Sequence, residues 1–134
     1  MKILVAYDGS EGAKRALEIV AELLPSGATV TVLAVAEGVP MLSYMGTIAS
    51  EEQDEERRRQ LEEAETELRG HGIEGATVLR RGDPASAILG EAEEEDVDVI
   101  VLGTRGLSTA ERWLMGSVST KVLHHAHCSV LVVR

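Results

Sequence analysis

One spaced glycine pattern in the sequence suits the binding of a small anion. Gly103 and Gly106 are followed, after nine residues, by Gly116 and Ser117, which gives the spacing G-x2-G-x9-G-S. Glycine lets a backbone approach an anion closely, and a helix start offers unpaired N–H groups at the positive end of its dipole. Isolated glycines usually only shape turns, but this pattern follows an expected strand and opens an expected helix over 117–126. The spacing therefore predicts a phosphate-binding loop.

Side chains around this pattern add donors for a phosphate but no catalytic machinery. Ser117 and Ser119 offer hydroxyls, and Arg105 is the nearest cation. The sequence contains neither a G-x4-G-K-[ST] phosphate loop nor a G-x-G-x-x-G dinucleotide fingerprint, and neither Ser10 nor Ser117 lies in a nucleophile elbow. Asp8 is a single carboxylate that could hold a metal ion on bound phosphates, which is weak support for hydrolysis. The sequence therefore favours binding over catalysis.

Apolar runs rich in branched residues predict the strands that position this loop. They lie at residues 3–7, 29–35, 97–102 and 129–133, and a weaker run lies at residues 78–80 and their neighbours. Strands that alternate with helices predict right-handed crossovers and a Rossmann-like α/β fold. We expect a doubly wound open sheet of five parallel strands in the order 3-2-1-4-5, with about four helices on its two faces. In such sheets ligands bind outside the carboxyl ends of the strands, here after the first and fourth.

Capping residues mark the starts of the helices between these strands. Ser10 opens a helix whose apolar positions repeat with the spacing of one buried face. Asp83 caps another helix, and Pro84 occupies its first position. Ser50 and Gln53 have the spacing of a capping box, so a further helix is expected to begin there.

The segment before that capping box, about residues 37–49, is expected to be a mobile loop with an apolar character. Its larger apolar side chains are those of Met41, Leu42, Tyr44 and Met45. Such a loop can close over a ligand or contact a partner, and a merely flexible loop fits the sequence equally well.

Length and cysteine content indicate one domain, residues 1–134, that needs no disulfide scaffold. Cys128 is the only cysteine and lies in a late apolar stretch, as expected of a small buried hydrophobe in a reducing compartment. The apolar run at residues 1–7 is too short for a signal peptide or a membrane span. We therefore expect a cytoplasmic protein.

The charge balance argues against large polyanionic partners. The chain has 23 acidic and 13 basic residues, a formal net charge of -10, which disfavours DNA and acidic membrane surfaces. It has no Phe, two Tyr and one Trp, so the stacking platforms of single-strand binders are missing. We expect neither a nucleic acid nor a membrane as partner.

Taken together, five segments resemble the universal stress protein family over nearly the whole chain. They are ILVAYDGS at 3–10, RGDP at 81–84, VIVLGTRG at 99–106, GSVS at 116–119 and SVLVV at 129–133. Their combination is much more specific than any one of them. The resemblance is to the ATP-binding branch and implies ATP as the ligand, with Mg²⁺ held by its phosphates.

The resemblance also implies a role for each candidate site residue. Asp8 would lie at the nucleoside, although a plain turn role for it stays open. Ala6, where some members have proline, would lie beside it, and Val35 would offer its backbone to the adenine. Leu102, Gly103, Arg105 and Gly106 would line the middle of the site, and the phosphates would contact Gly116, Ser117, Val118 and Ser119. Threonine is common at the last of these positions.

Four residues near the end of the chain have the side chains that zinc prefers: His124, His125, His127 and Cys128. On a helix the first two would diverge by about 100 degrees, and the cysteine falls where the helix gives way to a strand. Polar or cationic residues at a helix C-terminus are a sufficient explanation. We therefore expect no metal site here.

The apolar run 129–133 contains no charge, and an edge strand of this kind aggregates unless something covers it. Pairing with a second copy would cover it, and the family resemblance also implies a homodimer through this strand; an interior strand is the alternative. The sequence thus predicts a homodimeric ATP-binding stress-response regulator whose protein partners it does not identify. Two alternatives stay open: a nucleotide-independent homodimeric interaction protein and a slow ATP hydrolase.

Overall fold

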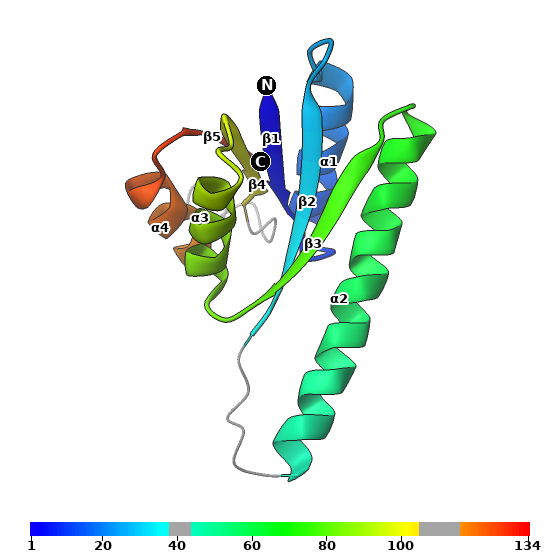
Figure 1. Cartoon of the computed structure of the whole chain (residues 1–134), viewed down its shortest axis with the longest axis vertical. Helices are drawn as coiled ribbons and strands as arrows, with labels where there is room; N and C mark the ends of the chain where they lie inside the picture. The colour runs from blue at the N-terminus through cyan, green and yellow to red at the C-terminus, as the bar shows by residue number, and fades with distance from the viewer. Residues whose placement is uncertain (38–43, 105–115) are drawn as a thin grey trace.

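The computed structural model describes residues 1–37, 44–104 and 116–134, with only the backbone described for 44–50. The strands are β1 (Lys2–Ala6), β2 (Thr29–Ala36), β3 (Gly75–Arg81), β4 (Val99–Gly103) and β5 (Ser129–Val133). The helices are α1 (Glu11–Leu23), α2 (Tyr44–Gly70), α3 (Pro84–Glu94) and α4 (Ser117–His125). All strand pairs are parallel, in the order β3-β2-β1-β4-β5 (Figure 1). The predicted α/β class and strand order are confirmed.

Helices pack on both faces of this sheet. Apolar residues of α1 and α2, such as Leu17 and Leu68, form one core with Val5 and Val32. Residues of α3 and α4, such as Ile88 and Val122, form a second core on the opposite face. Alternate side chains of a strand point to opposite faces, which is why neighbouring residues of β1 belong to different cores.

The two predicted caps form as expected. The Ser10 hydroxyl accepts a hydrogen bond from the backbone N–H of Ala13 at 3.2 Å, at the start of α1. The Asp83 carboxylate accepts one from the backbone N–H of Ser86 at 3.0 Å, and Pro84 is the first residue of α3. Both helices therefore begin where the local sequence predicts.

The start of α2 differs from the expectation. The helix begins at Tyr44, so Ser50 and Gln53 lie inside it and do not cap it, and the prediction of a loop is wrong for residues 44–49. The segment 44–49 contains good helix formers, and a single interior glycine costs only about 1 kcal/mol. Capping-box spacing alone therefore did not mark the start. Residues 38–43, with Met41 and Leu42, lie outside the described residues, as do the side chains of Tyr44 and Met45.

The start of β4 is also later than predicted. Val97 donates its N–H to the Ala92 carbonyl at 2.9 Å, and Asp96 has a left-handed φ of 51°, so these residues finish the turn that ends α3. Pairing with β1 begins only at Val99.

The strand order has its switch point at β1, which pairs with β2 on one side and with β4 on the other. Chain connections leave the two sides of such a switch point in opposite directions, which opens a crevice at the carboxyl ends of the strands. Helix α2 has 27 residues, against five to eight in each strand, and it extends past this edge of the sheet (Figure 1). Within the described part of the chain, no helix is long and apolar enough to cross a membrane.

Candidate functional site

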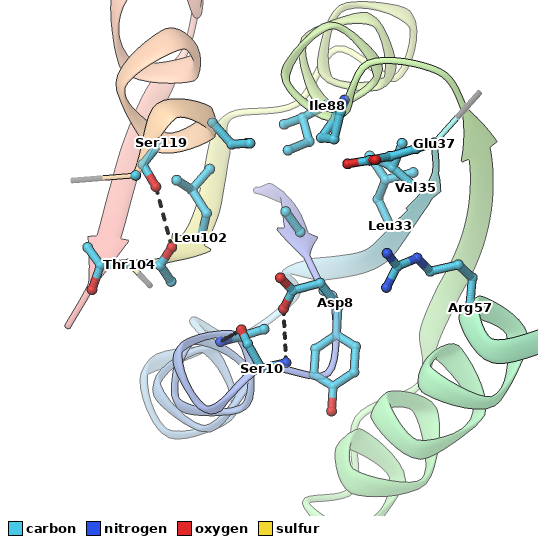
Figure 2. A pocket seen from close by; sticks show the side chains of 17 residues that line it. Asp8, Ser10, Leu33, Val35, Glu37, Arg57, Ile88, Leu102, Thr104 and Ser119 are labelled. Carbon is cyan, nitrogen blue, oxygen red and sulfur yellow. Dashed lines mark hydrogen bonds between the residues drawn. The ribbon is translucent and has the colours of Figure 1, made fainter. Parts of the chain in front are cut away.

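A cavity of about 200 Å³ lies in this crevice (Figure 2). The ends of β1, β2 and β4 form its floor, α3 and the start of α4 form one wall, and the start of α1 and one side chain of α2 complete it. Eight predicted positions line it together: Ala6, Asp8, Val35, Leu102, Gly103, Gly116, Val118 and Ser119. Ser117 is exposed at the start of α4 and is not part of the lining, and Arg105 and Gly106 lie outside the described residues.

Apolar side chains line much of the cavity. Leu33 and Val35 of β2 face it from one side, Ile88 of α3 from another, and Leu102 and Val118 complete the slot. Leu33, Ile88 and Leu102 are nearly completely buried, so the slot is rigid. Such a slot suits a flat, weakly polar group such as a heterocyclic ring.

Asp8 stands at the centre of the cavity on a tight turn. Its Oδ1 accepts a hydrogen bond from the backbone N–H of Ser10 at 2.9 Å, and Gly9 between them has a left-handed φ of 77°. Asp8 therefore does hold the turn, the role that the sequence left open. A carboxylate offers about four acceptor positions, so this bond leaves the exposed group able to accept from ligand hydroxyls as well.

The first glycine of the pattern is required by packing. A Cβ on Gly103 would lie 2.3 Å from the backbone carbon of Gly12 and 2.4 Å from its oxygen. A Cβ on Gly12 would lie 2.2 Å from the carbonyl oxygen of Thr104. The end of β4 and the start of α1 therefore cross backbone against backbone, which seats the Asp8 turn beside the end of β4.

The start of α4 faces the cavity from the opposite side. Gly116 is its N-cap and has no side chain with which to cap the helix, and the first N–H groups of a helix lie at the positive end of its dipole. Ser119 is buried, and its hydroxyl donates to the Gly103 carbonyl at 3.4 Å. This contact joins the two glycine-containing ends of the pattern, Gly103 and Gly116, on the same side of the cavity.

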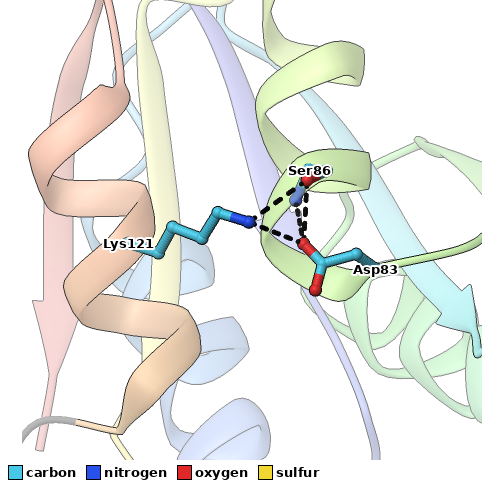
Figure 3. Close-up of polar contacts among 3 residues, drawn as sticks. All are labelled: Asp83, Ser86 and Lys121. Carbon is cyan, nitrogen blue, oxygen red and sulfur yellow. Dashed lines mark hydrogen bonds and ion pairs between the residues drawn. The ribbon is translucent and has the colours of Figure 1, made fainter.

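A polar cluster ties α3 to α4 outside the cavity (Figure 3). Asp83 accepts hydrogen bonds from the N–H of Ser86 at 3.0 Å and from its hydroxyl at 2.8 Å, and the Lys121 ammonium lies 3.1 Å away. The backbone N–H of Ser86, followed by its hydroxyl and Lys121, lowers the pKa of Asp83 to about 2. The cluster therefore holds together the two helices that form one wall of the cavity.

Tyr7 underlies the cavity on the α2 side. Burial, with the nearby carboxylates of Glu63 and Glu67, raises the pKa of Tyr7 to about 12. Its phenol therefore stays neutral at physiological pH, and its N–H donates to the Leu33 carbonyl at 2.8 Å.

The sequence did not single out several lining residues. Arg57 and Glu37 supply charge, and Tyr7, Leu33, Thr104 and Ile88 supply shape. Arg57 lay in a run of charges, although its spacing to Leu61, Ala64 and Leu68 places it on the buried face of α2. That periodicity was a usable signal. No comparable local signal marked Glu37.

The histidine and cysteine residues near the end of the chain lie at the amino ends of the strands, opposite the cavity at the carboxyl ends. His125, His127 and Cys128 border a separate hollow between the ends of α3 and α4. Burial raises the pKa of the Cys128 thiol. Among the residues that the structure describes, no group of three or more His, Cys, Asp or Glu side chains is placed to hold a metal ion.

Comparison with known proteins gives matches along the whole chain. Residues 1–134 match the universal stress protein family. A universal stress protein of Thermus aquaticus is 43% identical over 98% of this chain and 97% of its own length. Among solved structures, hypothetical protein MJ0577 is 29% identical, with a TM-score of 0.87 over 98% of this chain and 94% of its own.

A second solved structure, the universal stress protein from Archaeoglobus fulgidus in complex with dAMP, is 28% identical. Its TM-score is 0.76, over 100% of this chain and 98% of its own. Sequence motifs, strand order and both kinds of comparison thus agree along the full length of the chain. The chain belongs to the universal stress protein family.

Proposed function

We propose that this protein binds ATP in the cavity at the carboxyl ends of β1, β2 and β4. The observation that carries the proposal is the order of chemical features across that cavity. The apolar side chains of Leu33 and Val35, the carboxylate of Asp8 and the start of α4 at Ser119 follow one another across it (Figure 2), in the order that a base, a sugar and a phosphate chain require. The complex of the Archaeoglobus fulgidus relative with dAMP supports an adenine nucleotide as the class of ligand.

In this arrangement the adenine occupies the slot between Val35 and Ile88, and the ribose lies at Asp8, whose carboxylate accepts from sugar hydroxyls. The phosphates lie toward Gly116 and Ser119, where the dipole and first N–H groups of α4 favour negative charge. The phosphate oxygens carry the Mg²⁺, because it keeps several waters and takes few protein ligands.

The role that we propose is a nucleotide-dependent switch in the stress response, within the cytoplasm. Bound ATP changes the surface that the protein offers to a protein partner. The cavity holds no nucleophile paired with a base among the described residues, so we propose no hydrolysis step. Measurement of phosphate release tests that choice directly.

A homodimer through β5 is part of the proposal. β5 is an edge strand of the sheet, and Leu131 on it is 41% exposed. An apolar edge with unpaired backbone groups is satisfied by a second copy. Light scattering on the parent and on Leu131→Lys measures this: a dimer that becomes a monomer supports the interface, and a monomeric parent refutes it.

The test of the function starts with the purified protein. Small molecules released by denaturation are identified, and ATP with Mg²⁺ is then titrated by calorimetry into the parent and into Gly116→Val. The added side chain stands at the start of α4, where the phosphates bind, so we expect loss of binding with the fold retained by circular dichroism.

Gly70→Ala is the control for that experiment, because Gly70 is exposed at the far end of α2 with open space around it. It is expected to bind as the parent does. If the parent retains no nucleotide on purification and binds none in the titration, the proposed function is overturned. Steady phosphate release that Gly116→Val abolishes would establish a hydrolase instead.

A further inference from the structure

Arg57 brings a guanidinium to the cavity from α2, the helix that extends past the carboxyl edge of the sheet. In Figure 2 it lies beside Val35 and Glu37 at the end of β2, on the side of the cavity away from Ser119. It therefore stands at the end of the cavity where the base and sugar bind, and opposite the proposed phosphate end.

A hydrogen bond to a neighbouring residue of α2 holds the guanidinium in place. Arg57 Nη1 donates to Gln60 Oε1 at 2.9 Å, one turn along the same helix. Gln60 is only 9% exposed and packs against the turn that carries Asp8, since a Cβ on Gly9 would lie 3.0 Å from Gln60 Nε2. Arg57 is thereby fixed relative to the centre of the cavity.

Much of the donor capacity of Arg57 is unused. A guanidinium has five N–H donors, and the Nε of Arg57 is buried without a hydrogen-bond partner among the described residues. Two carboxylates, Asp8 and Glu37, line the same cavity, yet within the described part of the chain neither forms an ion pair with Arg57.

We propose that Arg57 is a ligand-binding residue for the nucleoside half of the nucleotide, and that it covers the outer side of the base. The planar guanidinium stacks on aromatic rings and donates to ring nitrogens and sugar hydroxyls, neither of which needs a phosphate. The proposal rests on the proposed function and adds a side chain from α2 that connects this helix to the bound ligand.

The test is a comparison of three ligands that share the nucleoside and differ in phosphate number. Adenosine, AMP and ATP are titrated by calorimetry into the parent, Arg57→Met and Arg57→Lys at two salt concentrations. We expect Arg57→Met to weaken all three by a similar factor, about tenfold, with little change in salt dependence. Lysine keeps the charge but not the planar fork, so it should restore little.

Arg58→Met is the matched control, because Arg58 is the next residue of α2 and is exposed. It should leave the affinity for all three ligands unchanged. A separate readout follows the Arg57 Nε–H resonance, assigned by its loss in Arg57→Met, which should shift when adenosine is added. A shift of this resonance, without a shift of the Arg58 Nε–H resonance, would place the ligand beside Arg57.

The possible outcomes separate the two proposals. Unchanged adenosine affinity in Arg57→Met, in a parent that binds ATP, overturns the role of Arg57 and leaves the proposed function standing. The role of Arg57 is also overturned if the loss of affinity in Arg57→Met is larger for ATP than for adenosine and becomes smaller in high salt. The contact is then to phosphate. A parent that binds none of the three refutes both.

Discussion

Substitution of Gly103 by alanine should destabilise the fold itself. The new Cβ would lie 2.3 Å from the backbone carbon of Gly12, 2.4 Å from its oxygen and 2.8 Å from the nitrogen of Ala13. Comfortable contacts between such atoms are about 3.5 Å or longer, so α1 and β4 must separate by roughly 1 Å. All three atoms belong to the backbone, and α1 is anchored in the core by Leu17, so no flexible side chain can move aside.

Forced overpacking of this kind costs about 3 kcal/mol. That is about a 100-fold shift toward the unfolded state, and roughly 10 °C in melting temperature for a chain of this size. The measurement is urea unfolding followed by circular dichroism, on protein refolded after removal of any bound nucleotide, because a ligand would raise the apparent stability.

Gly70→Ala is again the control, since nothing lies within 4 Å of its added Cβ. Its free energy of unfolding should stay within about 0.5 kcal/mol of the parent. Gly12→Ala should behave like Gly103→Ala, because its Cβ meets the Thr104 carbonyl at 2.2 Å. If Gly103→Ala unfolds within about 0.5 kcal/mol of the parent, the crossing of β4 and α1 is not as tight as described.

Two further predictions concern polar contacts. Arg80→Met should lower the free energy of unfolding in urea by about 2 kcal/mol, because it leaves the carboxylate of Glu91, which is 4% exposed, without its ion pair. Glu94→Gln, at the exposed end of the same cluster, should lower it little. Asp83 has a folded pKa of about 2, below its ordinary 3.8, so its contribution to stability is present above pH 3.8 and is lost as pH falls toward 2. Lys121→Met should raise that pKa in an NMR titration; an unchanged value would mean that Ser86 alone sets it.

Local signals in the sequence predicted the fold well. Ser10 and Asp83 cap their helices through hydrogen bonds to residues three positions away, so the relevant partners are visible in a short stretch of sequence. The doubly wound sheet was expected from the alternation of strands and helices. The start of α2 could not be predicted, because Ser50 and Gln53 have the spacing of a cap and yet lie within a continuous helix.

The candidate site was predictable where it depends on the chain near a strand end, and not where it depends on contacts between distant segments. Asp8 and Val35 follow or end strands that could be recognised, and they line the cavity. Gly12 meets residues about ninety positions away, and no local pattern reports such a crossing. Arg57 was obscured by the charged run around it, although its helical spacing to Leu61 places it on the buried face.

Gly103 and Gly116 of the G-x2-G-x9-G-S pattern therefore have different roles, one in packing and one at a helix start. This difference decides which of them is substituted to test the site. Gly103 lines the cavity but is already required by the approach of Gly12, so loss of binding in a Gly103 variant would report a disturbed fold as readily as a lost ligand contact. Gly116 is the N-cap of α4 and has an ordinary extended backbone, with φ -65° and ψ 163°, which any residue adopts. A side chain at Gly116 can be accommodated by the backbone while it obstructs the helix start, so substitution there isolates the contribution of the phosphate end.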